Sequence, residues 1–412
     1  MTSSHRVGAE RAGPAGMGFA EFVVLMALTT SIVALSIDVM LPALPEIGRD
    51  LSAATENDRQ LVVTAFFLGL SISPLVFGVA GDAFGRKPVV FVGLGLFILG
   101  CAVSAFATSF AAMLVGRVIQ GVGAAAPRVL SVAIIRDRYE GRAMAQVLSL
   151  VMAVFIFVPV VAPTLGLGML RLAEWRAIFL ILLGLAGLIL FWMALRLPET
   201  LAPGNRRPVS LSGVWHGVKA TLSQRFVLGH VLATGFVFGA FTAYLSSAQQ
   251  VLGEAYGLGD AFAPVFGALA LAIGAAGLLN ARLVMSIGMR RLSDRALVGL
   301  MAVSAVYLVA DTVLGAPPLW GFLAWCAPAF FCVGGLFANL NALAMEPLGR
   351  LAGTGAAVIQ SISNFMGAGI GMLIARSYDG SAAPIVLGFA LCGATAMICA
   401  GWARTGAREA RP

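Results

Sequence analysis

Long apolar stretches that recur along the chain constrain its fold more than any other feature. A helix needs about 20 mostly apolar residues to cross a bilayer. Of the 412 residues, 59% are hydrophobic and 11% are charged, whereas soluble domains carry about 25% charged residues. The sequence therefore predicts an all-α membrane protein with twelve spans, at 21–44, 60–80, 88–108, 111–134, 143–168, 175–196, 226–250, 262–285, 294–314, 319–343, 353–375 and 383–403.

The basic residues test this map, because cytoplasmic loops carry an excess of Lys and Arg. With the N-terminus inside, 20 of the 27 Lys and Arg residues fall in cytoplasmic segments, 5 in outer segments and 2 within the fourth span. This asymmetry predicts that both termini are cytoplasmic. The net charge of +8 then reports topology, so we expect the lipid bilayer as a partner and no nucleic acid.

A linker divides the spans into six plus six. Its first part is rich in Pro, Gly, Asn and Arg, and its second part has apolar residues at helical spacing, which predicts a short interfacial amphipathic helix. Similar sequences end the second and eighth spans. Repeated six-span halves, with a site between them near the midplane, are one transporter architecture. The predicted parts are a cytoplasmic tail (1–20), an N-terminal six-helix bundle (21–196), the linker (197–225), a C-terminal six-helix bundle (226–403) and a second cytoplasmic tail (404–412).

Asp38 is the only carboxylate that falls well within a predicted span. A charged side chain at the centre of a spanning helix costs about 2.5–3.5 kcal/mol on insertion scales. Such residues usually face a bundle interior or a wet cavity, and they often handle protons or ions. The alternative is a polar residue that only joins helices.

The fourth span contains the sequence RVIQGVGAAAPR, residues 117–128. At 1.5 Å rise per residue, Arg117 lies at about the same depth as Asp38, which predicts that the two pair across a cavity. A purely structural role for Arg117 is the alternative. Gln120 lies one turn from Arg117. Arg128 lies on nearly the same helix face and about 16 Å deeper, and its role as structural or functional stays open.

A short cytoplasmic turn, GVAGDAFGRKP, joins the second and third spans at residues 78–88. Gly85 permits the tight reversal. Asp82 can accept hydrogen bonds from a helix N-terminus or pair with an arginine, and Arg136 is the expected partner. The turn resembles the loop signature G-x-x-x-D-x-x-G-R-[RK] of the major facilitator superfamily. The resemblance implies a role in conformational gating for Gly78, Asp82, Gly85, Arg86, Lys87 and Arg136.

Other motifs resemble one branch of that superfamily. The fourth span is similar to the R-x-x-Q-G-x-G-A-A motif of its drug:proton antiporters. The patterns D-x-x-L-P-A-L-P from Asp38 and P-x-x-A-P-x-x-G from Pro159 resemble the bicyclomycin/chloramphenicol-resistance (Bcr/CflA) branch. This adds Pro159, Pro163 and Gly166 to the expected gating residues. Two departures stand out: the fifth span lacks the paired glycines of G-x-x-x-G-P-x-x-G-G, and Ala83 replaces a frequent arginine.

The resemblance implies a proton-coupled exporter of small amphipathic drugs in a bacterial inner membrane, working as a monomer by alternating access. Asp38 would carry the proton, and Arg117 would tune its proton affinity because a nearby cation favours the carboxylate. The expected cavity residues are Asp38, Arg117, Gln120, Arg128, Tyr244, Asn339 and Asn341. A proton-coupled metabolite exporter or importer on the same fold is the alternative, because fold does not fix function.

Other classes of protein are disfavoured. The three histidines are scattered and the five cysteines form no C-x-x-C pair, so we expect no metal, no cofactor and no enzyme. No G-x-x-x-x-G-K-[ST] motif is present, which argues against an ATP-driven pump.

Overall fold

The computed structural model describes residues 17–206 and 208–409. Twelve helices in this part of the chain are long and apolar enough to cross a membrane, which confirms the predicted fold class. They are α1 (Phe19–Asp38), α3 (Leu61–Phe84), α4 (Arg86–Ala105), α5 (Phe110–Arg138), α6 (Gly141–Leu172), α7 (Arg176–Arg196), α9 (Arg225–Ala248), α10 (Phe262–Ile287), α11 (Met289–Leu314), α12 (Leu319–Met345), α13 (Ala352–Arg376) and α14 (Ala383–Glu409).

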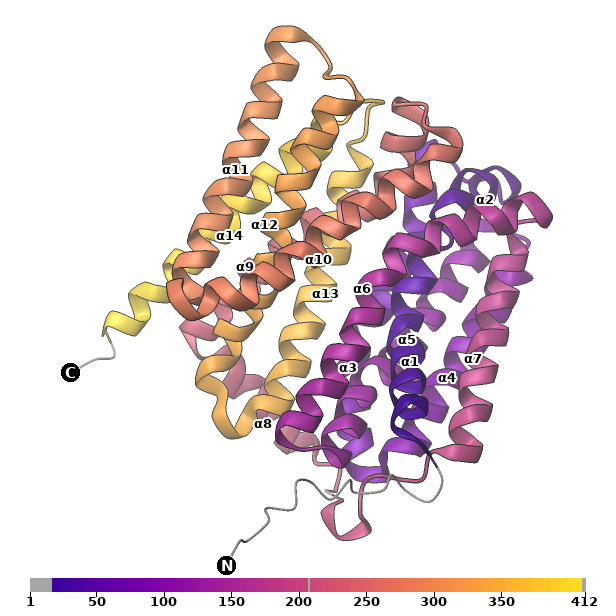
Figure 1. The fold of residues 1–412 in the computed structure, drawn as a ribbon, viewed down its shortest axis with the longest axis vertical. Helices are drawn as coiled ribbons and strands as arrows, with labels where there is room; N and C mark the ends of the chain where they lie inside the picture. Colours follow the sequence, from indigo (N-terminus) through magenta and orange to yellow (C-terminus); the bar gives the residue numbers. More distant parts are fainter. Residues whose placement is uncertain (1–16, 207, 410–412) are drawn as a thin grey trace, which may run out of the picture.

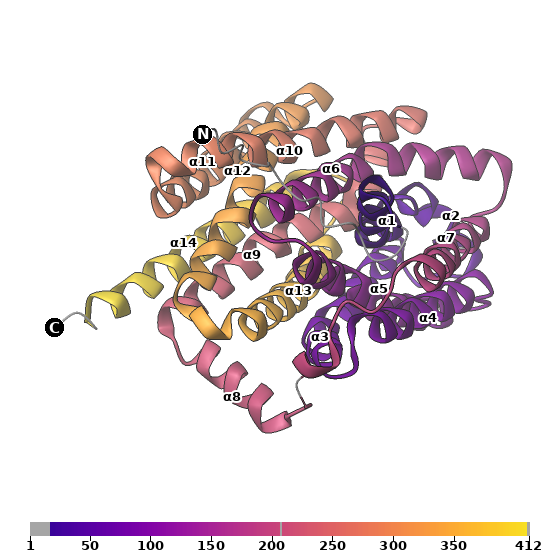
Figure 2. The same ribbon diagram turned by 60° about the horizontal axis from the view of Figure 1, so that its bottom comes forward.

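These helices form two bundles, seen from two directions in Figures 1 and 2. Helices α1 and α3–α7 make the N-terminal bundle, and α9–α14 make the C-terminal bundle. The bundles meet along α3 and α13 and along α6 and α10. At the second contact, Gly267 of α10 lies against the backbone of Val160 in α6. Small residues at such places let two membrane helices approach closely.

Short elements cover the ends of the spans. Helix α2 (Leu44–Asp50) follows α1 after a 3₁₀ turn, and each of these two elements has a proline in its first turn, where the missing N–H costs nothing. The predicted linker helix is present as α8 (Leu211–Leu222), and Gly217 packs it against Thr354 of α13. The last span differs from the prediction, because α14 continues past residue 403 to Glu409.

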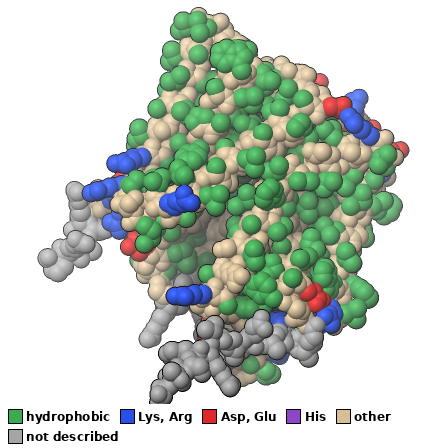
Figure 3. Space-filling view, viewed as in Figure 1, with side chains coloured by type: hydrophobic (Ala, Val, Ile, Leu, Met, Phe, Trp, Pro, Cys, Tyr) green, Lys and Arg blue, Asp and Glu red, His purple; other side chains and the backbone are tan. Residues whose placement is uncertain are grey.

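We call the helix ends assigned to the cytoplasm the inner ends and the others the outer ends. On the face shown in Figure 3, Lys, Arg, Asp and Glu gather towards the ends of the helices, and the surface between them is mostly hydrophobic. This belt is the surface that a bilayer requires.

Glycines on α5 hold that helix between two neighbours. A methyl group added at Gly123 would collide with the backbone of α4, and one at Gly121 would collide with the Phe66 carbonyl of α3. This close packing fixes the position of α5, and with it the arginines that α5 carries in the interior of the bundle.

Candidate functional site

Asp38 is the last residue of α1 and is 4% exposed. Gly166 of α6 lies against the backbone carbonyl of Val39, so closely that a side chain there would collide with it. The predicted motif at the outer half of α6 therefore packs α6 against the turn of α1 that carries Asp38. Among the residues whose side chains the structure describes, none forms a hydrogen bond or ion pair with the carboxylate of Asp38.

Arg117 is fully buried, and three acceptors bind its guanidinium. Nε donates to the carbonyl of Val62 at 3.0 Å, Nη2 donates to the carbonyl of Ser36 at 3.2 Å, and Nη1 donates to Oε1 of Gln120. Its Cζ also lies 4.6 Å from the ring centroid of Phe66.

The predicted ion pair between Arg117 and Asp38 is wrong for this structure. Arg117 does reach α1, but it binds the backbone of Ser36, two residues before Asp38. The physical reason is that buried carbonyls and one amide already satisfy the guanidinium. The matched depth inferred from helix rise was correct, while the choice of acceptor depended on packing.

Gln120 holds Arg117 in place. Its Oε1 accepts from Arg117, and its Nε2 donates to Sγ of Cys101 in α4 at 3.0 Å. Both ends of the fully buried amide are thus occupied inside the N-terminal bundle.

Among the candidates of the C-terminal bundle, Tyr244 interacts electrostatically with Asp38. It is 1% exposed, and its hydroxyl, which lies within electrostatic range of Asp38, has no hydrogen-bond partner among the described residues. Its ring packs edge-on against Phe330, with centroids 4.6 Å apart, and stacks on Phe266 at 5.9 Å. Two bundles therefore contribute to the surroundings of Asp38.

The two predicted asparagines bond within their own bundle. Asn339 exchanges hydrogen bonds with Asn280 of α10, at 3.1 and 2.7 Å, and Asn341 donates to the carbonyl of Phe337 at 2.9 Å. Their amides join helices in this conformation, as polar groups in membrane bundles often do.

The turn between α3 and α4 forms an ionic chain. Gly85 has φ of 106°, which a glycine adopts without strain. Asp82 pairs with Nη1 of Arg86 at 2.6 Å, and Nε of Arg86 pairs with Asp137 of α5 at 2.9 Å. The predicted partner Arg136 is wrong: it is exposed, and Arg86, buried between the two acids, takes that position.

Glu199 completes this inner site, and sequence reasoning missed its role. Its carboxylate accepts from the backbone N–H groups of Arg86 at 2.9 Å and Lys87 at 3.1 Å. These are the free donors at the start of α4, where an anion is stabilised. A side chain at Gly85 would collide with this carboxylate. Glu199 lies in the sequence Pro198-Glu199-Thr200, directly after the sixth span, and nothing in this local sequence identifies its partner.

The remaining gating candidates lie in two places. Lys87 donates from Nζ to the carbonyl of Ala194 in α7 at 3.0 Å. Gly78 lies in α3 one turn before Asp82, with open space around it. Pro159 and Pro163 lie inside α6, where each removes a backbone N–H and bends or weakens the helix.

Polar contacts join the two bundles at their outer ends, and the sequence gave no local sign of them. Arg59 pairs with Glu254 at 2.5 Å, and Asn57 donates to the carbonyl of Tyr378 at 3.0 Å. Gln60 also bonds to Gln250. We call these three contacts the outer latch. Further along the same interface, Asn364 of α13 donates to the carbonyl of Leu70 in α3 at 3.3 Å.

The outer latch depends on an irregular turn. Residues Gln249–Ala255 form a π-helix at the outer end of α9, a conformation often found at functional sites. It carries both Gln250 and Glu254 of the latch.

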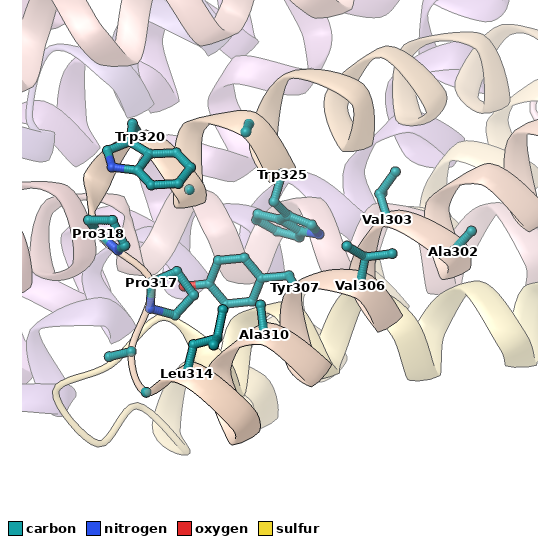
Figure 4. Close-up of a pocket in the computed structure, with 14 residues that line it drawn as sticks. Ala302, Val303, Val306, Tyr307, Ala310, Leu314, Pro317, Pro318, Trp320 and Trp325 are labelled. Carbon is teal, nitrogen blue, oxygen red and sulfur yellow. The ribbon is translucent and has the colours of Figure 1, made fainter.

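A groove of about 470 Å³ lies apart from these residues, between α11 and α12 (Figure 4). Its lining includes Tyr307, Pro317, Trp320 and Trp325. Trp320 is 74% exposed, so the groove opens on the outside of the C-terminal bundle. It contains none of the predicted site residues.

Comparisons with known proteins agree with this architecture. A family model described as Major Facilitator Superfamily matches residues 26–372. The chain is 32% identical over 343 residues to an uncharacterized MFS-type transporter, YdgK, of Bacillus subtilis, covering 82% of this chain and 85% of that protein. It is 30% identical over 378 residues to a bicyclomycin resistance protein homolog of Haemophilus influenzae, covering 90% and 93%.

Among solved structures, the chain resembles a partially occluded inward open conformation of the xylose transporter XylE from E. coli. The TM-score is 0.68, with 15% identity over 95% of this chain and 97% of that one. At this identity the likeness shows the fold alone.

Proposed function

The chain belongs to the Major Facilitator Superfamily, and from this premise we propose that it exports small amphipathic drugs in exchange for protons. Membership makes it a multi-pass membrane transporter rather than an enzyme. The drug substrate, the proton and the outward direction are the proposed part. The bicyclomycin resistance homolog supports the choice of substrate class.

The observation that carries the proposal is Asp38. Its carboxylate is 4% exposed in a membrane span and has no cationic or hydrogen-bonding partner among the described residues. An unpaired charge in such a place is costly, and binding a proton removes the cost. The same carboxylate lies where the two bundles meet, near Tyr244, so a proton and a substrate would compete for one space.

Alternating access supplies the rest of the mechanism. The outer latch holds the outer ends together through Arg59 and Glu254, and a substrate would enter between the inner ends. Rocking of the bundles would then break the latch and close the inner face. We propose that the chain of Asp82, Arg86 and Asp137 controls that closure, and that Arg117 orients the segment of α1 that carries Asp38.

Exchange in vesicles tests the proposal. Purified protein is reconstituted, and inside-out vesicles with an acidic lumen are given chloramphenicol or bicyclomycin. We expect the drug to accumulate and the pH gradient to fall partly. Asp38→Asn is nearly isosteric and cannot release a proton, so it should bind drug yet abolish both effects. Full proton-driven accumulation by Asp38→Asn would refute the mechanism, and accumulation driven by an inward proton gradient in right-side-out vesicles would indicate an importer.

A further inference from the structure

We infer that this transporter selects anionic amphipathic substrates, and that Arg128 binds their carboxylate or equivalent acidic group. The inference rests on the proposed function, because it names the substrate class for the same cavity. Neither the family match nor the relatives assign a role to this residue.

Arg128 differs from Arg117, the other arginine in the interior of the spans. It lies ten residues from the inner end of α5 and is half-buried. No hydrogen bond, ion pair or aromatic contact joins it to a described residue. Arg117, on the same helix, has three acceptors and a ring against it. Arg128 is therefore a cation inside a span, and none of the N–H groups of its guanidinium has a partner among the described residues.

The position of Arg128 follows from the contacts on either side of it. Arg117 bonds to Ser36 of α1, and Arg138, at the inner end of α5, lies over the ring of Phe22 in α1 at 4.7 Å. The two helices run in opposite directions between these contacts. Arg128 lies eleven residues after Arg117, three full turns, so it points to nearly the same side of α5.

Because Arg128 lies between Arg117 and Arg138 along α5, its depth in the bundle corresponds to the middle of α1. Thr30 and Ser31 lie there, both buried, and neither hydroxyl has a hydrogen-bond partner among the described residues. Because buried polar groups are nearly always hydrogen-bonded, two hydroxyls without partners at the depth of a free guanidinium indicate a place for a polar ligand. A carboxylate accepts from both kinds of donor.

We place the opening beside Arg128 on the inner side, because Arg128 lies in the inner half of α5. Its side chain is partly exposed although the residues before it, Ala124–Pro127, are buried. The outer latch closes the outer side of the interface between the bundles. A cytoplasmic ligand would therefore meet Arg128 before it reaches Asp38.

Charge arithmetic favours an anion. With Asp38 ionised, the two interior arginines leave a net charge of +1 in the N-terminal bundle. A monoanionic substrate brings the loaded interior to neutrality, whereas a cationic drug raises it to +2. Uncompensated charge inside a membrane is costly, so a monoanion crosses at the lowest cost.

Aromatic side chains of the C-terminal bundle suit the apolar part of such a ligand. Phe337 of α12 is half-buried and packs edge-on against Phe238 and Phe241 of α9, with centroids 5.8 and 5.6 Å away. Phe238 in turn touches Phe67 of α3, at 5.6 Å. An aromatic acid would place its ring on these side chains and its carboxylate at Arg128.

Matched ligands test the inference. The probes are naphthalene-1-carboxylate, its primary amide and naphthalen-1-ylmethylammonium, with the same three groups on a biphenyl scaffold, and dissociation constants are measured on purified full-length protein. We expect the carboxylate to bind about 10- to 100-fold more tightly than the amide, the value of a hydrogen bond to a charged group. Arg128→Met should lose this preference and leave the affinity for the amide unchanged. Arg128→Lys should keep most of the preference, because it keeps the charge.

Arg142→Gln is the control, because it removes an exposed cation at the inner end of α6 without touching the interior. It should leave all affinities unchanged, and thermal unfolding checks that every variant is folded. The inference is overturned if no carboxylate binds, if the amide or the ammonium binds as tightly as the carboxylate on both scaffolds, or if Arg128→Met weakens all probes equally.

Proton exchange separates this inference from the proposed function. If an ammonium probe binds most tightly and still exchanges for protons, the anionic class is wrong and drug export stands. If the carboxylate binds through Arg128 but no probe exchanges for protons, export is wrong and the anion site stands.

Discussion

The two bundles place very different side chains at the same positions counted from the starts of corresponding helices. Asp38 is the twentieth residue of α1, and Tyr244 is the twentieth of α9. Arg117 is the eighth residue of α5, and Cys326 is the eighth of α12. Arg128 and Phe337 are both the nineteenth residue of the same two helices. The positions along the paired helices match, but the charges of the side chains do not.

This difference suggests a division of labour between similar scaffolds. Deep within its spans the N-terminal bundle holds the carboxylate of Asp38 and the guanidinium groups of Arg117 and Arg128, while the C-terminal bundle has a phenol, a thiol and a phenyl ring at the matching places. Charge inside a membrane is expensive and is kept where it has a use. We therefore expect proton and anion handling on one side and an adaptable apolar wall on the other.

The test with the largest expected effect substitutes each residue of the first pair, Asp38 and Tyr244, separately. Asp38→Asn should reduce uphill transport to the level of empty liposomes, and Asp38→Glu should retain part of it because a carboxylate remains. Tyr244→Phe should retain most of the transport, since its hydroxyl has no partner to lose among the described residues. Proton-driven uptake into proteoliposomes measures all three. Equal loss in Asp38→Asn and Tyr244→Phe would contradict the division of labour.

For the second pair, Arg117 and Cys326, the comparison is the loss of folding stability caused by substitution with alanine. Arg117→Ala leaves the carbonyls of Ser36 and Val62 and the amide of Gln120 without their donor. A buried group left unsatisfied costs about 1–3 kcal/mol, so we expect a total loss of several kcal/mol. Cys326→Ala removes one buried sulfur and should cost about 1 kcal/mol. Thermal unfolding of the detergent-solubilised variants measures the difference, and similar midpoints would show that Arg117 is not a structural centre.

Acidic residues at the inner ends give a smaller contrast. Asp82→Asn should slow turnover several-fold and spare drug affinity, because it loosens the pair with Arg86 far from Asp38. Asp294 pairs with Arg404 within the C-terminal bundle, with both side chains 38% exposed. Such pairs contribute about 0–1 kcal/mol, so Asp294→Asn should change neither quantity. Turnover rates and drug dissociation constants, measured for both variants in the same preparation, test this contrast. Loss of drug binding in Asp82→Asn would overturn its assigned role.

The smallest expected effect concerns the contact that joins the bundles. A double-mutant cycle with Arg59→Gln and Glu254→Gln should give a coupling energy of about 1 kcal/mol, because Arg59 is buried but Glu254 is partly exposed. The readout is the alkylation rate, by an impermeant maleimide, of a cysteine introduced as Thr64→Cys below the latch. Each single variant should raise the rate by favouring outer opening. Unchanged rates in both would show that the latch does not hold this conformation.

Sequence reasoning located the site better than it described the contacts. Helix rise placed Arg117 beside the outer part of α1, and the bond to Ser36 confirms that depth. It did not identify the acceptors of Arg117, nor Arg86 as the partner of Asp82. Depth follows from regular geometry, whereas partner choice depends on rotamers and on several helices packing together.

The sequence by itself determined the twelve spans, the division into two halves and the deep positions of Asp38, Arg117 and Arg128, because bilayer thickness and helix geometry restrict them strongly. The tertiary structure alone decided which of those charges are satisfied. It gave Arg117 three acceptors and left Arg128 with none among the described residues. It also joined Arg59 to Glu254 across 195 positions of chain, a pairing that packing creates and no local pattern encodes.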